Sequence, residues 1–373
     1  MIVLIGIICL AGWVYLIGFH GRFWRSSPEL GAEAPGRTAK VVAVVPARNE
    51  AAHIARSVGS LLSQDYGGEF WIVLVDDNST DGTAAIATAL AAAPRLEIVA
   101  GQPLPQGWTG KLWAIQQGLA HPRAQDGEYI LLTDADIEHA PGHLSSLVAK
   151  AEHDHLDLVS EMAHLHCGTL AERALIPAFV FFFQMLYPFA WTADPRRGLA
   201  AAAGGTILVS RMAMERIGGV SRIRGELIDD CALARMVKSP GGRIWLGHSS
   251  RARSIRVYNW GEIWNMTART AYVQLGNSAF ALLGCLAGMG LLFVAPPALA
   301  ICGHGLARLL GALTWAAMAL VFQPTLHRYR STPFWGLALP LIALFYLGAT
   351  LASAFRHYTG SGGGWKGRVY PTS

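Results

Sequence analysis

The sequence predicts an α/β protein in which a doubly wound, mostly parallel sheet is joined to membrane helices at both ends. Strand-like and helix-like patterns alternate after Lys40, which is typical of parallel sheets built from strand–helix–strand units. Acidic residues directly follow two of the apolar strands. Hydrophobic residues make up 52% of the 373-residue chain and charged residues only 15%, and the apolar excess lies toward the two ends.

Hydrophobic patterns define each element of the predicted sheet. Residues 40–46 (KVVAVVP) are a largely β-branched run, typical of a strand buried on both faces. Residues 51–63 then carry apolar side chains at helical spacing. The alternation continues with strands expected over 71–75, 96–100, 129–132, 156–165 and 204–210, and helices over 83–93, 112–119 and 229–238.

Apolar segments on both sides of this domain predict membrane attachment. Residues 2–19 are almost free of charge and long enough to cross a bilayer, so we expect residues 1–21 to be an uncleaved anchor; a signal peptide is the alternative. Residues 279–354 are expected to be a C-terminal transmembrane region and 355–373 a tail. The apolar run 174–191 is expected to be an interfacial helix on the bilayer, with a buried core helix as the alternative.

The basic residues indicate how the chain is oriented. A cluster after the first apolar segment (Arg22, Arg25, Arg37 and Lys40) places the following domain in the cytoplasm by the positive-inside rule. We therefore expect a multi-pass protein of the cell (inner) membrane. Three C-terminal passes would put the basic tail on the opposite side, which the same rule disfavours, so one of the three apolar stretches could instead be re-entrant or interfacial.

Net charge and cysteine content narrow the classes of partner. The net charge is +5, but no basic stripe is interleaved with aromatic residues, so a nucleic-acid partner is not expected. An anionic membrane surface and a diphosphate explain the positive charge better. The five cysteines have no paired spacing, which argues against a disulfide framework or a zinc site.

Two acidic clusters carry the strongest chemical signal. Asp76 and Asp77 follow the second strand, and Asp134 and Asp136 follow the strand over 129–132. The carboxyl edge of an open α/β sheet is where such folds bind ligands. Two carboxylates separated by one residue suit a hard cation, Mg²⁺ or Mn²⁺, that shares its coordination shell with substrate phosphates. The sequence therefore predicts a site for a metal–diphosphate nucleotide; a capped turn is the structural alternative.

Five motifs occur in an order that resembles the family 2 glycosyltransferases of the GT-A fold. They are PARNE (46–50), VDDNSTDGT (75–83), GWTGKLWA (107–114), TDADI (133–137) and GELIDD (225–230). The resemblance implies a Rossmann-like GT-A domain over residues 38–275. Together with RTAYVQL (269–275) and a terminal WKGRVY (365–370), the sequence is most similar to the hopanoid-biosynthesis-associated membrane glycosyltransferases. It resembles ceramide glucosyltransferases more distantly.

The resemblance also implies roles on the donor side. Asp136 would contact the metal directly and Asp134 would lie toward the ribose while sharing the metal site. Asp77 would read the nucleobase, whereas Asp81 could equally cap the following helix. Lys111 would pair with the diphosphate, with a solvated surface lysine as the alternative. The pocket around the nucleotide would be completed by Pro46, Arg48 and Glu50.

On the acceptor side, the resemblance assigns the general base to Asp230. An inverting transfer needs a carboxylate that takes the acceptor's proton while the nucleotide leaves from the opposite face. Capping of a helix start is the alternative for Asp230. Arg269 is the one residue left of the QxxRW motif of processive synthases and is expected to contact the diphosphate. The loss of the other residues argues for transfer of a single sugar.

The expected function is an inverting, metal-dependent transfer of one sugar from a nucleotide-sugar, expected to be a UDP-sugar, to a membrane lipid such as a hopanoid. One alternative is a polyprenyl-phosphate sugar transferase, whose phosphate acceptor needs no general base. Another is a catalytically silent membrane scaffold that keeps the nucleotide pocket. A nucleotidyltransferase is disfavoured because PARNE stands where a Gly-rich phosphate loop is expected. Sugar, base and metal stay open.

Overall fold

The computed structural model describes residues 1–31, 35–91, 93–360, 364–365 and 368–369. Its α/β domain is built on an eight-stranded sheet with the order β3-β2-β1-β4-β7-β6-β8-β5. The strands are β1 (Val41–Ala47), β2 (Phe70–Asp76), β3 (Leu96–Ala100), β4 (Tyr129–Thr133), β5 (Ile137–His139), β6 (Leu158–His164), β7 (Thr206–Ser210) and β8 (Ile244–Ser254).

The two halves of this sheet differ in strand direction. Strands β3, β2, β1 and β4 are all parallel, which confirms the predicted doubly wound half. Strand β7 runs antiparallel to both β4 and β6, and β5 runs antiparallel to β8, while β6 and β8 are parallel. The sheet is therefore mixed, although mostly parallel. The sequence patterns did not predict the short β5 or the long β8.

Alternate residues of β1 face two separate helical layers. Val41 and Val45 pack with α2 and α6 on one face, whereas Val42 and Val44 pack with α4 and α10 on the other. This two-sided burial is the reason why the strand has an unbroken apolar sequence. The helices of the domain are α2 (Ile54–Leu62), α3 (Thr83–Leu90), α4 (Gly110–Leu119), α5 (Pro122–Gln125), α6 (His143–His153), α9 (Arg211–Arg216), η1 (Val220–Ile223) and α10 (Asp229–Lys238).

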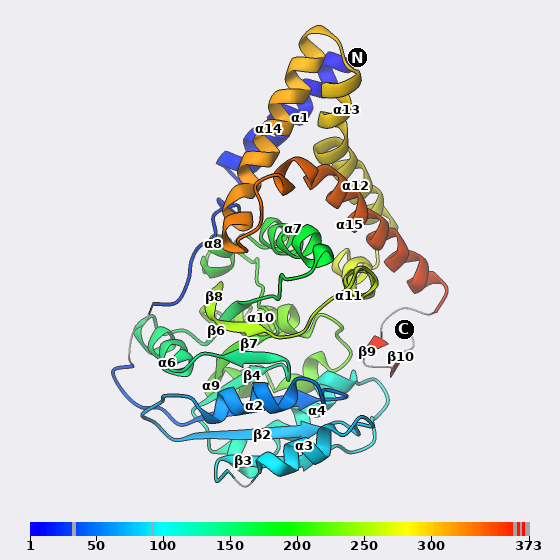
Figure 1. Ribbon diagram of the computed structural model, residues 1–373. Coiled ribbons are helices and arrows are strands. Elements are labelled where there is room, and N and C mark those ends of the chain that lie inside the picture. Colours follow the sequence, from blue (N-terminus) through cyan, green and yellow to red (C-terminus); the bar gives the residue numbers. More distant parts are fainter. Residues whose placement is uncertain (32–34, 92, 361–363, 366–367, 370–373) are drawn as a thin grey trace.

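The remaining helices form a tapered assembly on one side of the domain (Figure 1). Helices α7 and α11 lie next to the sheet domain, and α1, α13 and α14 reach the far end. These helices are α1 (Ile2–Gly18), α7 (Leu170–Leu186), α8 (Phe189–Ala193), α11 (Trp260–Gln274), α12 (Ala279–Met289), η2 (Gly290–Val294), α13 (Ala295–Cys302), α14 (Gly305–Arg328) and α15 (Trp335–Tyr358). Two short strands, β9 (Gly364–Trp365) and β10 (Arg368–Val369), pair near the C-terminus.

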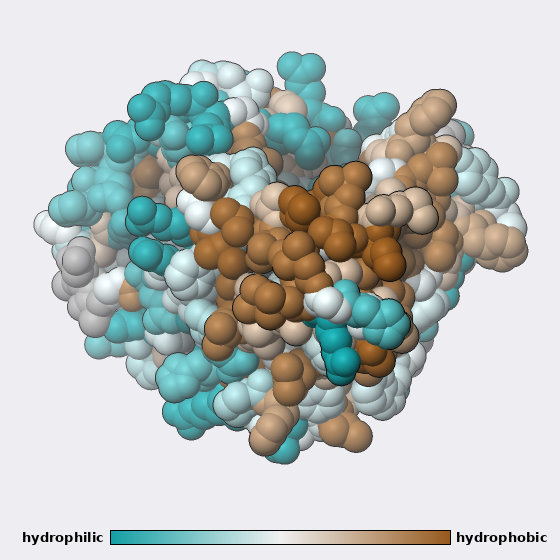
Figure 2. Space-filling model, turned by 90° about the horizontal axis from the view of Figure 1, so that it is seen from above, coloured by the Kyte–Doolittle hydropathy of each residue, from teal (hydrophilic) through white to brown (hydrophobic). Residues whose placement is uncertain are grey.

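Three helices in the described residues are long and apolar enough to cross a membrane: 279–302, 305–328 and 335–358. Helix α1 is apolar but shorter, at 17 residues, and Trp13 on it donates from Nε1 to the Leu292 carbonyl at 2.8 Å. Figure 2 shows apolar side chains gathered on the face formed by this helical end. The anchor over 1–21 remains a prediction. Part of the tail over 355–373 lies outside the described residues.

The apolar run 174–191 differs from the expected interfacial helix. The chain breaks at Tyr187 and Pro188 into α7 and α8. Most of α7 is buried, with Ile176 and Phe181 fully enclosed in a cluster that includes residues of α14 and α15. Helices α14 and α15, which lie far from α7 in the sequence, thus cover the apolar side chains that we expected to contact the bilayer. The buried core helix, the alternative, describes α7 better.

Candidate active site

Parallel pairing brings the predicted site residues to one edge of the sheet. In the β1–β2 register Pro46 is opposite Val75 and Ala47 is opposite Asp76, and β4 lies on the other side of β1. The carboxyl ends of the three strands therefore meet. Pro46, Lys111, Asp134, Gly204, Asp229 and Asp230 are among the residues that line one pocket at this edge.

Lys111 is the central cation of this pocket. It lies in the first turn of α4, and its Nζ is 2.9 Å from Asp134 Oδ1 and 3.2 Å from Asp229 Oδ2. Burial lowers the pKa of Lys111, but the carboxylates of Asp134, Asp229 and Asp230 more than offset this and raise it above its usual value. Lys111 is therefore a charged pocket residue rather than a solvated surface lysine.

Asp230 faces the same pocket from the start of α10. Its Oδ2 accepts a hydrogen bond from the Gly204 amide at 2.9 Å, and its Oδ1 accepts one from the Cys231 amide at 2.7 Å. Burial, together with the negative charge of Asp229, raises the pKa of Asp230 to about 6. The bond to Cys231 satisfies an amide at the helix start, so the capping role coexists with the pocket position.

Arg256 is a site residue that the sequence patterns missed. Its Nε donates to Asp136 Oδ2 at 2.7 Å, and its Nη2 lies 2.5 and 2.6 Å from the two carboxylate oxygens of Glu50. Arg256 follows β8, and the neighbouring Ile255 amide donates to the Asp136 carbonyl. The pairing of β8 with β5 places Arg256 there. If the sequence analysis had predicted a strand over β8, the position of Arg256 just after that strand would have indicated a place at the site.

Arg48 and Asp77 meet at the ends of β1 and β2. Arg48 Nη1 donates to the Asp77 carbonyl at 2.5 Å and lies 3.9 Å from Asp77 Oδ2. Asp77 is fully buried. Asp81 instead holds the start of α3, because its carboxylate accepts from the Thr83 amide and from the Ala51 amide. Asp81 therefore stabilises the start of α3, as the capping alternative expected, although the N-cap residue itself is Gly82.

Arg269 is not joined to this cluster. It lies on α11, which packs against α15. Within the described part of the chain its Nε is buried without a hydrogen-bond partner, and no ion pair links it to the acidic residues. The expected diphosphate contact stays a prediction.

The donor atoms at Asp134 and Asp136 fit a hard divalent cation. Each carboxylate uses one oxygen in its ion pair with Lys111 or Arg256, and its second oxygen has no hydrogen-bond partner among the described residues. Among those residues, no three or more His, Cys, Asp or Glu side chains lie together as a complete metal site. Mg²⁺ characteristically takes one or two carboxylates and completes its shell with water and substrate phosphates.

The strand order and the helices that cover the sheet define an α/β domain of the GT-A type. Residues 42–218 match the model of the family described as Glycosyl transferase family 2. This part of the chain is therefore similar to the glycosyltransferases of family 2, the family that the motif order indicated.

Two curated relatives are similar over part of the domain. An undecaprenyl-phosphate 4-deoxy-4-formamido-L-arabinose transferase of Shewanella sediminis (strain HAW-EB3) is 36% identical over 111 residues, covering 29% of this chain and 32% of the relative. The enzyme of that name from Sodalis glossinidius (strain morsitans) is 34% identical over 125 residues, covering 32% of this chain and 36% of the relative. The chain thus spans about a third of each relative. The hopanoid-associated subfamily remains a prediction.

A solved structure is similar over nearly the whole chain. The mannosyltransferase PcManGT from Pyrobaculum calidifontis, in complex with GDP-Man and Mn²⁺, superposes with a TM-score of 0.62. The match covers 95% of this chain and 98% of that one at 21% identity. At this identity the likeness establishes the fold, including the helices that accompany the α/β domain.

Proposed function

We propose that this chain is a membrane glycosyltransferase that transfers a single sugar, with inversion, from a nucleotide-sugar to a lipid acceptor. The observation that carries the proposal is the shared pocket of Asp230, Lys111 and Asp134 at the ligand-binding edge of a family 2 domain. A carboxylate with a pKa of about 6 stands there beside a cation suited to a diphosphate.

On the donor side, the proposal assigns the nucleotide to the ends of β1, β2 and β4. Asp77 and Arg48, with Pro46 and Glu50, would line the nucleoside pocket. Lys111 is held by two carboxylates and would bind the diphosphate of the donor, proposed to be a UDP-sugar. Asp134 and Asp136 would hold Mg²⁺ or Mn²⁺, which neutralises the charge that develops on the leaving diphosphate.

On the acceptor side, Asp230 would act as general base. It would take the proton of an acceptor hydroxyl while the acceptor oxygen bonds to the anomeric carbon and the nucleoside diphosphate leaves from the opposite face. A pKa of about 6 leaves the carboxylate ionised at neutral pH yet basic enough to accept a proton. The hydrogen bonds from Gly204 and Cys231 fix the orientation of the carboxylate.

The apolar helices support a lipid acceptor. Helices α14 and α15 meet the domain through the cluster around α7, so an amphiphile embedded among them could reach the domain from the bilayer. We assign the domain to the cytoplasmic side of the inner membrane, from the basic residues that follow α1. A hopanoid hydroxyl is the acceptor implied by the motif resemblance.

A polyprenyl phosphate is a second candidate acceptor. The observation that favours it is the similarity to two transferases whose names specify undecaprenyl phosphate. A phosphate oxygen is already ionised and needs no general base. The role of Asp230 therefore separates the two acceptors.

The test uses the full-length protein in lipid nanodiscs with Mg²⁺ or Mn²⁺ and a panel of UDP- and GDP-sugars. Release of free nucleoside diphosphate is followed with either a total lipid extract or undecaprenyl phosphate as acceptor. We expect release that requires lipid and is lost in Asp136→Ala. Asp230→Asn should abolish transfer to a hydroxyl lipid and leave transfer to a phosphate. Nucleotide binding without release from any donor would instead support the silent scaffold.

A further inference from the structure

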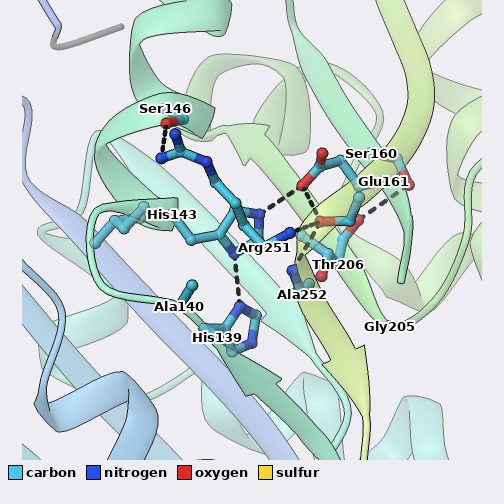
Figure 3. Close-up of polar contacts among 12 residues, drawn as sticks. His139, Ala140, His143, Ser146, Ser160, Glu161, Gly205, Thr206, Arg251 and Ala252 are labelled. Carbon is cyan, nitrogen blue, oxygen red and sulfur yellow. Dashed lines mark hydrogen bonds and ion pairs between the residues drawn. The ribbon is translucent and has the colours of Figure 1, made fainter. Parts of the chain in front are cut away.

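A buried chain of polar side chains runs from the end of β4 into the core of the domain. Figure 3 shows its central members, His139, His143 and Glu161. It links Thr133 on β4, His139 on β5, His143 at the start of α6, Glu161 on β6 and Ser249 on β8. Each of these residues is at most 3% exposed. Burying so many polar groups is costly unless all are hydrogen-bonded.

The direction of each hydrogen bond follows from its partners. Thr133 donates its hydroxyl to the Gly205 carbonyl at 2.8 Å, so it accepts from His139 Nε2 at 3.0 Å. Burial and the neighbouring His143 hold the pKa of His139 well below its usual value, so its ring is neutral. His139 Nδ1 must then accept from His143 Nδ1, at 2.9 Å.

The chain ends in a proton shared by His143 and Glu161. With its Nδ1–H directed at His139, His143 faces Glu161 Oε2 through Nε2 at 2.5 Å, and one proton must lie between them. Ser249 accepts from the amides of Arg251 and Ala252 and donates its own hydroxyl to Glu161 Oε2 at 3.0 Å. With these donors and acceptors, each of the five side chains in the chain is hydrogen-bonded to the next.

This chain reaches the candidate active site on both sides. The segment that carries Asp134 and Asp136 begins after Thr133 and ends before His139. Thr133 and His139 are hydrogen-bonded to each other, so they hold the two ends of this segment together. Thr133 also holds the carbonyl of Gly205, whose neighbour Gly204 donates its amide to Asp230. The same hydrogen bonds therefore set both the acidic segment and the backbone that orients Asp230.

We propose that His139, His143 and Glu161 are positioning residues, which hold the carboxylates of Asp134 and Asp136 and the Gly204 amide in the arrangement that sugar transfer requires. The inference rests on the proposed function for the identity of the reaction. Packing alone does not call for these groups, since a buried ion pair can often be replaced by apolar side chains without loss of stability. Groups that orient metal ligands typically change metal affinity or activity about 10- to 100-fold when removed.

The test compares Glu161→Leu with Glu161→Gln in the full-length protein. Leucine leaves His143 Nε2 without a partner, whereas the glutamine amide can donate to it and keep the hydrogen bonds from His143 to Thr133 in the same direction. Only the bond that Ser249 donates to the same Glu161 oxygen is then lost. Binding of Mn²⁺ in the presence of UDP or GDP is measured by electron paramagnetic resonance, beside kcat and KM. We expect Glu161→Leu to weaken Mn²⁺ binding and lower kcat about 10- to 100-fold, and Glu161→Gln to keep both closer to the wild-type values than Glu161→Leu does.

Two further variants separate positioning from folding. Gln184→Leu removes two buried hydrogen bonds, to the carbonyls of Phe23 and Arg25, and should lower the melting temperature without changing Mn²⁺ affinity. Thr133→Val breaks the same chain at its other end, so its effect and that of Glu161→Leu should not add in the double variant.

Unchanged Mn²⁺ affinity and kcat in Glu161→Leu would overturn the inference even if wild type transfers sugar. If the wild type fails to bind Mn²⁺ in the presence of either UDP or GDP, both the inference and the metal-dependent mechanism are overturned.

Discussion

Asp229 and Asp230 are adjacent in the chain but have different surroundings. Asp229 is paired with Lys111 at 3.2 Å, whereas Asp230 accepts two backbone hydrogen bonds. The charge of Asp229 and burial both disfavour the ionised form of Asp230, and its pKa rises from 3.8 to about 6. One carboxylate therefore balances a cation while its neighbour can act as a base.

This difference predicts the pH dependence of transfer. If Asp230 is the general base, as proposed, its ionised form is the active one, so kcat/KM should be constant above about pH 6 and fall roughly tenfold per pH unit below it. Asp229→Asn removes a charge that raises this pKa, so its profile should break at a lower pH. Initial rates of both proteins, measured from about pH 4.5, near the ordinary carboxyl pKa, up to about pH 8, provide the check. A break that stays at the same pH in Asp229→Asn would point to titration of an acceptor phosphate, whose second pKa is about 6.

At the scale of elements, the ends of β1, β4 and β8 are held together by charge. Arg256, just after β8, bridges Glu50 after β1 and Asp136 after β4. Without a cation these two carboxylates would repel each other in a pocket where Asp136 is only 7% exposed. In the absence of bound metal, Arg256 supplies that positive charge.

Arg256→Leu should therefore destabilise the metal-free protein, by about 1–3 kcal/mol for the lost charged hydrogen bonds. Mn²⁺ should raise the melting temperature of this variant more than that of wild type, because the metal replaces part of the missing charge. The measurement is thermal unfolding with and without Mn²⁺. Arg253→Leu is the matched control, since Arg253 lies at the end of β8, three residues before Arg256, and pairs with Glu138 at the surface. Equal Mn²⁺ effects in all three proteins would contradict the prediction.

At the scale of the whole molecule, the α/β domain and the apolar helices share one core. A single cluster joins Trp13 of α1, Phe181 of α7, Phe322 of α14 and Tyr346 of α15. Tyr346 also donates its hydroxyl to the Leu175 carbonyl at 2.8 Å. The helices that would enter the bilayer are therefore part of the fold of the domain that carries the site.

Removing residues 276–373 should expose the apolar side of α7. Because exposed apolar patches of several hundred Å² promote association, we expect this truncated chain to aggregate without detergent and to lose donor binding. A chain ending at residue 360 retains α15 and should behave like the full-length protein in detergent. Sedimentation and nucleotide binding test both chains. A monodisperse, nucleotide-binding product of the first truncation would show that the domain folds independently.

Local sequence patterns were enough to predict the parallel half of the sheet and the edge at which the candidate site lies. The apolar runs of β1, β2 and β4 and the acidic residues after them are local patterns, and parallel strands must bring their carboxyl ends to one edge. The motifs around Lys111, Asp134 and Asp230 were predictable for the same reason, because each follows or begins a regular element.

The partners that these residues meet could not be predicted from local sequence. Arg256, the buried His143–Glu161 pair and the burial of α7 all depend on contacts between segments far apart in the chain. Their local sequences carry no signal of such contacts, because strand pairing and helix packing depend on surfaces that form only when the chain has folded. Hydrophobic periodicity indicates that a side chain is buried, whereas the neighbour that buries it follows from the topology.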